Sequence, residues 1–361
     1  MPRSRFLVCL ALFLSLLTTP ALAQVSRGSL LLRLTAASPV HSPHPVPEAA
    51  AGLGLFRNPA PERTELYLST NLAYAPLDRL LVGGQFSLSV SAGGDHGRRS
   101  YALQPYARYY LVNRAQLLAF GEVSTVIGYD GYDGYGFDRA RVAAGLQLPL
   151  GGGTYLTPAL QYSIGEGENS VGLAVGIEVL LGRRDTSSLP ATNMLGRGRV
   201  MLGGQSGSYA RTTSTNATGL ELGGHYLLTD RLAAAALFGY SRSHASYSFR
   251  NGTDNRHLTT RELHLAAGLR YYLAVHHRLG YYAEVGAGRV SYTIDTNVGV
   301  DYFDPSFTYL TVGGGAQYFL RRHLTLEAGP QLRYDLTNER WVPGLNVGVR
   351  VLLVAARASP N

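Results

Sequence analysis

Apolar and polar side chains alternate along this chain from about residue 28 onward. A clear example follows Glu262, where apolar side chains occupy every second position: Leu263, Leu265, Ala267, Leu269, Tyr271 and Leu273. Successive side chains of a β-strand point to opposite faces, so this pattern predicts a strand with one apolar and one mixed face. A mixed face of small residues with a few charges suits the interior of a narrow β-barrel.

The same alternation predicts two sets of eight strands. The first set lies near residues 28–37, 64–75, 80–91, 100–112, 116–129, 138–150, 154–165 and 170–182, and the second near 197–208, 217–228, 231–243, 260–273, 278–291, 306–320, 323–336 and 342–354. Tight connections, such as 76–79 and 112–115, alternate with longer ones, such as 38–63, 130–137 and 244–259. Short periplasmic turns opposite long external loops are typical of transmembrane barrels.

The two sets resemble one another in sequence. The segment GLAVGIEVLL from Gly172 matches GLNVGVRVLL from Gly344. Further matches occur in the same order: Asp78-Arg79 with Asp230-Arg231, Arg108-Tyr109-Tyr110-Leu111 with Arg270-Tyr271-Tyr272-Leu273, Glu122-Val123 with Glu284-Val285, and Pro158 with Pro330. The offset grows from 152 to 172 positions, with the changes in predicted loops, where insertions cost little. The pattern indicates an internal repeat.

Between the sets runs a largely polar segment, GRRDTSSLPATNMLGR, from Gly182 to Arg197. One large barrel needs only a short turn there, whereas a longer segment can link two closed barrels. We therefore expect an all-β, transmembrane, antiparallel up-and-down fold with two tandem eight-stranded barrels; the alternative is one sixteen-stranded barrel. Pairing of the strand at 170–182 with 28–37 would indicate two barrels, and pairing with 197–208 would indicate one.

The N-terminal residues predict export. Arg3 and Arg5 precede an apolar segment, 6–17, that is too short to span a bilayer, and Ala21-Leu22-Ala23 fits a signal-peptidase site. The expected organisation is a signal peptide at 1–23, a first barrel at 24–182, a periplasmic linker at 183–197, a second barrel at 198–354 and a tail at 355–361. The single cysteine, Cys9, lies in the signal, so no disulfide is expected in the mature fold.

Composition agrees with a barrel in the outer membrane of a Gram-negative bacterium. The chain has 45% hydrophobic and 16% charged residues, 43 glycines, and 24 tyrosines against 11 phenylalanines. Lipid-facing residues alternate with polar interior ones in such barrels, which fits the mean hydropathy of −0.01. All 32 basic residues are arginine. A coding bias is the simpler explanation, although arginine also pairs well with the phosphates of anionic lipids and lipopolysaccharide.

With this pattern in hand, each half resembles the small outer-membrane barrels that include OmpX and the OmpA barrel, and most of all the Bacteroidetes-type "outer membrane β-barrel domain" proteins. The resemblance covers nearly all of the mature chain, through motifs such as AAGLRYY at 266–272 and YAEVGAG at 282–288. It implies outer-membrane lipid, lipopolysaccharide, and the barrel assembly and periplasmic chaperone machinery as partners, with no nucleic acid. Such barrels usually end on an aromatic residue, whereas here the last strand ends at Leu353-Val354.

Strand parity places a set of charged residues inside the barrels. These residues are Arg108, Glu122, Arg141 and Glu178 in the first half, and Arg270, Glu284, Glu327, Arg333 and Arg350 in the second. Unpaired charges in a narrow interior are very costly, so we expect arginine–carboxylate pairs that fill each eight-stranded barrel. In one sixteen-stranded barrel the same residues would line a water-filled channel.

Other candidate chemistry is weaker. His244-Ala245-Ser246 has the His-x-Ser spacing of barrel lipid A deacylases, but no carboxylate lies suitably near, and we expect an exposed loop. Asp130 and Asp133, in a Tyr/Gly-rich segment at 129–136, are too few for a calcium site. His41 and His44 lie among prolines in a predicted loop and are not expected to bind a metal.

We therefore expect an integral outer-membrane barrel without catalysis or cofactor, with a structural or surface-interaction role carried by its extracellular loops. A porin-like passive diffusion channel, formed by a single sixteen-stranded barrel, is the alternative function.

Overall fold

The computed structural model describes most of the chain as β-strands. The described residues are 25–34, 52–59, 62–92, 98–114, 116–130, 134–151, 153–165, 169–182, 195–211, 215–248, 255–296, 306–321 and 324–353. In this part of the chain, no helix is long and apolar enough to cross a membrane. The predicted signal peptide, the predicted linker from residue 183 to 194, the C-terminal tail, His41 and His44 lie outside it.

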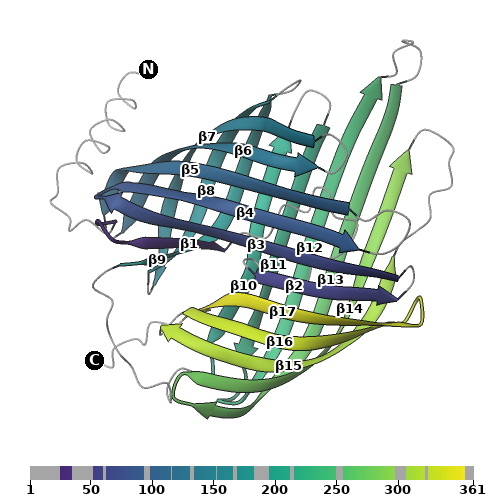
Figure 1. Ribbon diagram of the computed structural model, residues 1–361. Helices are drawn as coiled ribbons and strands as arrows, with labels where there is room; N and C mark the ends of the chain where they lie inside the picture. The colour runs from purple at the N-terminus through teal and green to yellow at the C-terminus, as the bar shows by residue number, and fades with distance from the viewer. Residues whose placement is uncertain are drawn as a thin grey trace, which may run out of the picture.

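The strands fall into two sets in chain order (Figure 1). The first set is β1 (Leu30–Leu34), β2 (Gly52–Pro59), β3 (Glu62–Leu77), β4 (Leu80–Ala92), β5 (Arg98–Arg114), β6 (Leu117–Asp130), β7 (Gly134–Gly151), β8 (Thr154–Gly165) and β9 (Ser170–Leu181). The second set is β10 (Val200–Arg211), β11 (Thr215–Leu227), β12 (Leu232–Ser248), β13 (Asn255–His276), β14 (Leu279–Thr296), β15 (Phe307–Arg321), β16 (Leu324–Asp335) and β17 (Arg340–Leu353). We call β1–β9 the first unit and β10–β17 the second unit.

Alternation along each strand separates an outer from an inner face. On β13 the outward side chains of Leu269 and Leu273 are 47% and 59% exposed. The alternate residues Arg270 and Tyr272 point inward and are 2% and 0% exposed. The outward face meets lipid in an outer-membrane barrel, so the apolar residues belong there and the polar residues belong inside.

At one end, each unit closes on itself. Residues 30–34 of β1 pair with residues 181–177 of β9, and residues 30–32 also pair with 74–72 of β3, which completes an eight-stranded ring. In the second unit, residues 200–202 of β10 pair with 353–351 of β17, and β10 also pairs with β11. The short turns, such as 78–79 and 277–278, lie at this end, which we call the turn end. The expected closure into two antiparallel eight-stranded barrels is therefore confirmed.

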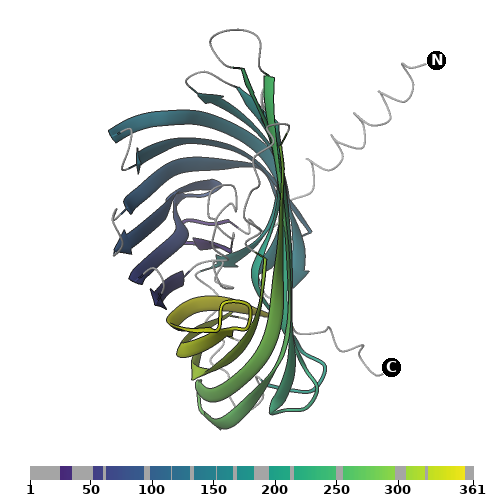
Figure 2. The same ribbon diagram turned by 90° about the vertical axis from the view of Figure 1, so that its right-hand side faces the viewer.

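At the opposite end, which we call the loop end, the two units exchange partners. Residues 171–176 of β9 pair with 211–206 of β10, and residues 344–348 of β17 pair with 56–52 of β2. Figures 1 and 2 show the two sets of curved strands joined in this way into one closed sheet. The strand at 170–181 thus makes both of the pairings that the sequence left as alternatives, each along a different part of its length.

An apolar wall lies between the two units where they separate. Outward-facing residues of β9 and β17, including Ile177, Val179 and Val351, are buried at 4%, 0% and 0% exposure. They pack in one cluster with Leu32 and Leu202. Outward apolar residues elsewhere, such as Leu173, Leu269 and Val285, are 48%, 47% and 53% exposed, so here the neighbouring unit takes the place of lipid.

Three loop predictions are wrong. The predicted loop at 130–137 is largely strand, because β6 continues to Asp130 and β7 begins at Gly134. The predicted loop at 38–63 contains β2, which has little alternation of its own because glycine and proline stand at several of its positions. The predicted loop at 244–259 is partly strand, because β12 continues through Ser248 and β13 begins at Asn255. His244 and Ser246 therefore lie in β12, and the Nδ1 atom of His244 is 2.8 Å from the Oγ1 atom of Thr259. The strand pairs extend beyond the length needed to span a membrane.

Candidate functional site: two buried ion networks

The interior of the first unit is crossed by a network of two arginines and two glutamates. Arg33 on β1 donates to Glu122 and to Glu178, with both N–O distances at 2.7 Å. Arg108 on β5 donates to the same two carboxylates, at 2.7 Å to Glu122 and 2.8 Å to Glu178. The side chains of Arg108 and Glu178 are each 1% exposed. The four charges cancel, and they come from two pairs of neighbouring strands, β1 with β9 and β5 with β6.

Neutral side chains complete the first network, which we call network 1. Gln147 and Thr157 both donate to Glu178, Thr157 over 3.1 Å. The guanidinium of Arg108 lies over the ring of Phe120, with the Cζ atom 3.7 Å from the ring centroid. Hydrogen bonds to the remaining carboxylate oxygens and a cation–π contact are what buried ions need if they are not to destabilise the fold.

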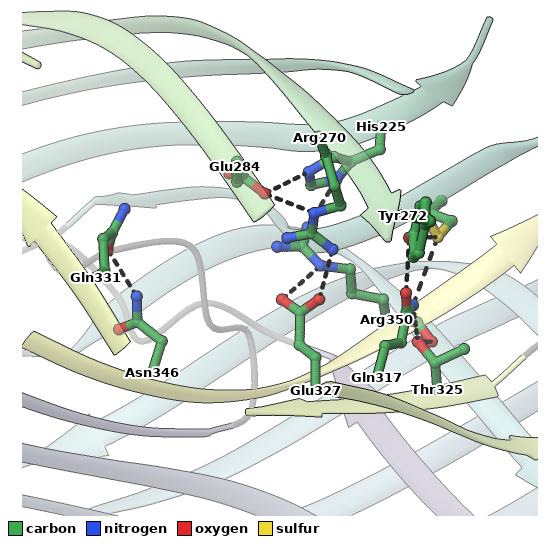
Figure 3. A network of polar contacts seen from close by, with 11 residues as sticks. His225, Arg270, Tyr272, Glu284, Gln317, Thr325, Glu327, Gln331, Asn346 and Arg350 are labelled. Atoms are coloured by element: carbon green, nitrogen blue, oxygen red, sulfur yellow. Dashed lines mark hydrogen bonds and ion pairs between the residues drawn. The ribbon is translucent and has the colours of Figure 1, made fainter. Parts of the chain in front are cut away.

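The second unit holds a similar network, network 2, shown in Figure 3. Arg270 on β13 donates to Glu284 at 2.5 Å and to Glu327 at 2.8 Å. Arg350 on β17 donates to the other oxygen of Glu327 at 2.6 Å. The guanidinium of Arg270 lies 3.9 Å from the centroid of the Tyr282 ring. Two arginines and two glutamates again balance.

His225 joins the two halves of network 2. Its Nδ1 atom is 3.2 Å from Nη1 of Arg350, and its Nε2 atom is 3.3 Å from Glu284. A guanidinium only donates hydrogen bonds, so Nδ1 accepts and the ring proton is on Nε2, where it donates to the carboxylate. A neutral His225 of this tautomer satisfies both neighbours without changing the net charge.

A layer of polar and aromatic side chains lies next to network 2. The Tyr272 hydroxyl donates to Gln317 over 2.7 Å, and Gln317 donates to Thr325 over 2.8 Å. On its other side lie cavities of about 60 and 50 Å³, whose lining includes Thr311, Gln331 and Asn346. Cavities of this size hold a few water molecules. Network 2 is thus packed on one side and adjoins small polar cavities on the other.

Seven of the nine residues that parity placed inside take part in the two networks. Arg141 does not reach network 1; its Nε atom donates to Ser163 over 3.2 Å. Arg333 does not reach network 2; its guanidinium lies 5.6 and 5.7 Å from the ring centroids of Phe307 and Tyr309. Both stand further along their strands toward the loop end, and strand parity carries no information on that depth.

The sequence interpretation missed two members, Arg33 and His225. Arg33 stands in the run LLLRL, where leucines on both faces hide the alternation. His225 had a usable signal, because Leu220 and Leu222 mark the outward parity of β11 and place residue 225 inside. The polar partners on β7, β8 and β15 had no signal of this kind, since glutamine and threonine also occur on outward faces.

The described residues offer no other clustered chemistry. Among them, no three His, Cys, Asp or Glu side chains gather in a way that could hold a metal ion. The His244 side chain contacts Thr259, a neighbour on β13, on the outward face. The two networks are therefore the candidate functional feature of the interior.

Comparisons with known proteins were made at the level of sequence and of structure. A search of curated proteins finds no significant match. Among solved structures, the chain is similar to a bacterial polysaccharide outer membrane secretin, with 10% identity, 92% of this chain and 99% of that chain covered, and a TM-score of 0.43. It is also similar to the N-terminal β-barrel domain of Pseudomonas aeruginosa OprF, with 19% identity, 44% of this chain and 98% of that chain covered, and a TM-score of 0.25. A third similar structure is the CymD monoaromatic hydrocarbon channel, with 13% identity, 94% of this chain and 91% of that chain covered, and a TM-score of 0.32. At these TM-scores, the activities of those proteins say nothing of this chain.

One family model also matches the sequence. It is the outer membrane protein beta-barrel domain, and it covers residues 186–351, which contain nearly the whole second unit. Together with the closed antiparallel sheet and its apolar outer face, this match indicates a β-barrel of the Gram-negative outer membrane.

Proposed function

We propose that the protein is a closed, non-enzymatic envelope barrel whose two units are each blocked by an ion network. The main support comes from networks 1 and 2. In each of them, two arginines and two glutamates form short ion pairs across an eight-stranded ring. An eight-stranded barrel has room only for side chains or a small ligand. Its role is then structural, or is carried by the segments at the loop end.

A passive diffusion channel is the second candidate. It is favoured by the loop end, where the β9–β10 and β17–β2 pairings join both units into one larger ring. Such a ring gives a wide entrance, but solutes still have to pass the two narrow turn ends, where networks 1 and 2 lie. We therefore favour the closed barrel.

We further propose that the two units arose by duplication of a Bacteroidetes-type barrel domain. Their first turns support this. Gly28 and Gly198 both have positive φ, and both donate to the second strand of their eight-stranded ring, at 2.9 Å to Ala75 and 2.8 Å to Leu227. The preceding residues, Arg27 and Arg197, donate their backbone N–H to aspartates of the next short turn, Asp78 and Asp230.

Planar-bilayer recording of the purified full chain tests the proposal. The closed barrel predicts no stable conductance steps above the detergent background. A variant carrying Glu122→Gln, Glu178→Gln and Arg108→Met, which removes most of the charge of network 1, serves as the comparison, because loosening the network should raise conductance. Large, stable steps from the unmodified protein would contradict the closed barrel and favour the channel.

A further inference from the structure

Three arginines stand on the outward face of the second unit, one on each of three consecutive strands. They are Arg242 on β12, Arg261 on β13 and Arg289 on β14, and all three side chains are exposed. Their outward orientation follows from alternation, since Tyr240, Leu265 and Val285 share their parity and are 36%, 47% and 53% exposed. We call these residues the arginine rim.

The arginine rim lies where the apolar band ends. On β13 the outward positions from 273 to 263 are all apolar, and Arg261 is the next outward residue toward the loop end. On β12 the outward run ends at Tyr240, before Arg242, and on β14 it ends at Ala287, before Arg289. An apolar run of about 9–11 residues spans the hydrocarbon core of a membrane. The next outward residue therefore lies at the level of the lipid headgroups.

Two rim arginines face one another directly. Arg242 and Arg261 are cross-strand partners in the sheet. Like charges in this position destabilise a strand pair unless an anion lies between them. Asp295 is a diagonal neighbour of Arg261, two positions beyond its partner Thr293, and His244 is the next outward residue on β12. Within the described residues, the rim arginines form no ion pair, so one aspartate leaves a net positive rim.

The first unit lacks this arrangement. By their place in the strands, Val90 corresponds to Arg242 and Ile127 to Arg289, and both are only partly exposed apolar residues. Of the three corresponding positions in the first unit, only the counterpart of Arg261 is an arginine, Arg99. A general preference of the chain for arginine does not explain a rim on one unit alone.

We propose that the arginine rim binds the phosphate groups of an outer-leaflet lipid, the phosphorylated lipid A headgroup of lipopolysaccharide. A guanidinium fits a phosphate with two parallel hydrogen bonds, and two facing guanidinium groups surround one phosphate better than one does. The acyl chains of such a lipid would lie against the exposed apolar residues below the facing pair, Leu265 on β13 and Phe238 on β12. The arginine rim lies on the outer wall of the barrel, so lipid binding there does not depend on whether the barrel conducts.

The test measures retention of diphosphoryl lipid A by the full-length protein in detergent micelles. The double variant Arg242→Gln, Arg261→Gln should bind about 30-fold more weakly, since each basic residue near an anionic lipid surface contributes roughly five-fold. The matched control is Arg231→Gln, Arg278→Gln, which removes two exposed arginines from the short turns at the other end and should bind like the unmodified protein. Unchanged thermal unfolding of both variants establishes that they fold.

Three outcomes would overturn the proposal. The rim variant could bind lipid A as well as the unmodified protein does. The control variant could lose as much affinity as the rim variant, which would indicate general charge attraction. Dephosphorylated lipid A, or inorganic phosphate alone, could bind as tightly as diphosphoryl lipid A, which would exclude a lipid phosphate as the ligand.

Discussion

Networks 1 and 2 have the same charges, but only half of those charges occupy corresponding positions. The pair on the fourth and fifth strands of each eight-stranded ring is shared, as Arg108 with Glu122 and as Arg270 with Glu284. In network 1 the other two charges are Arg33 on the first strand and Glu178 on the last strand. In network 2 they are Glu327 and Arg350, on the last two strands.

At each of the positions that are not shared, the two units have residues of different charge. Gly203 in the second unit takes the place of Arg33, and a Cβ atom on Gly203 would stand 3.2 Å from Nη1 of Arg350. Arg350 takes the place of Glu178, and Glu327 that of Tyr155. The two interiors therefore have the same balance of charges and the same kinds of ion pair, although different positions provide some of them. That is the behaviour expected where an unbalanced buried charge costs several kcal/mol.

The largest effect should come from reversing one charge of network 1. Glu178→Arg would leave Glu122 as the only carboxylate beside three guanidinium groups. The loss of unfolding free energy should exceed the roughly 3–5 kcal/mol for removal of one partner of a buried pair. Adding Arg33→Gly and Tyr155→Glu reproduces the arrangement of network 2 and should recover most of the loss. Urea unfolding in detergent measures both, and a triple variant no more stable than the single one would refute the exchange.

The second largest loss of unfolding free energy should come from removing the arginine that occupies the shared position in each network. Arg108→Met and Arg270→Met should each cost about 3–5 kcal/mol. Arg270→Met should cost more, because Glu284 would keep only the neutral His225, 3.3 Å away, whereas Glu122 would keep Arg33. Arg141→Met is the control, since that interior arginine lies outside both networks, and it should cost about 1 kcal/mol. Equal losses from all three variants, measured by the same unfolding experiment, would contradict a special role of the networks.

A smaller effect should follow from filling the space at Gly203. Gly203→Val would place new methyl groups against Arg350 and should cost about 1–3 kcal/mol, as overpacking of an interior does. Gly121→Val is the matched control, because a Cβ atom at Gly121 meets nothing within 4 Å. It should change stability by less than about 0.5 kcal/mol. If the two valine variants were equally stable, the guanidinium of Arg350 would not occupy the place left by Arg33.

Much of the interior could be predicted from the sequence because alternation is a local property. Side-chain parity along a strand is set by the backbone alone, so Glu122, Glu178 and Arg270 could be assigned to the interior without a structure. The same rule could not rank their depth, and so Arg141 and Arg333 were grouped with them. It also failed for Arg33, because leucines stand on both faces of β1.

The sequence by itself determined sixteen of the strands, most of their inner and outer faces and most of the charges inside them, but it did not reveal β2. Only the tertiary structure decided how the sheet closes. The strand at 170–181 pairs with β1 near the turns and with β10 near the loops, and β17 likewise changes partner from β10 to β2. Backbone hydrogen bonds are equally available to either neighbour, since the edge strands of the two units present the same donors and acceptors. The choice depends on which side chains pack between the strands, and those come from segments far apart in the chain.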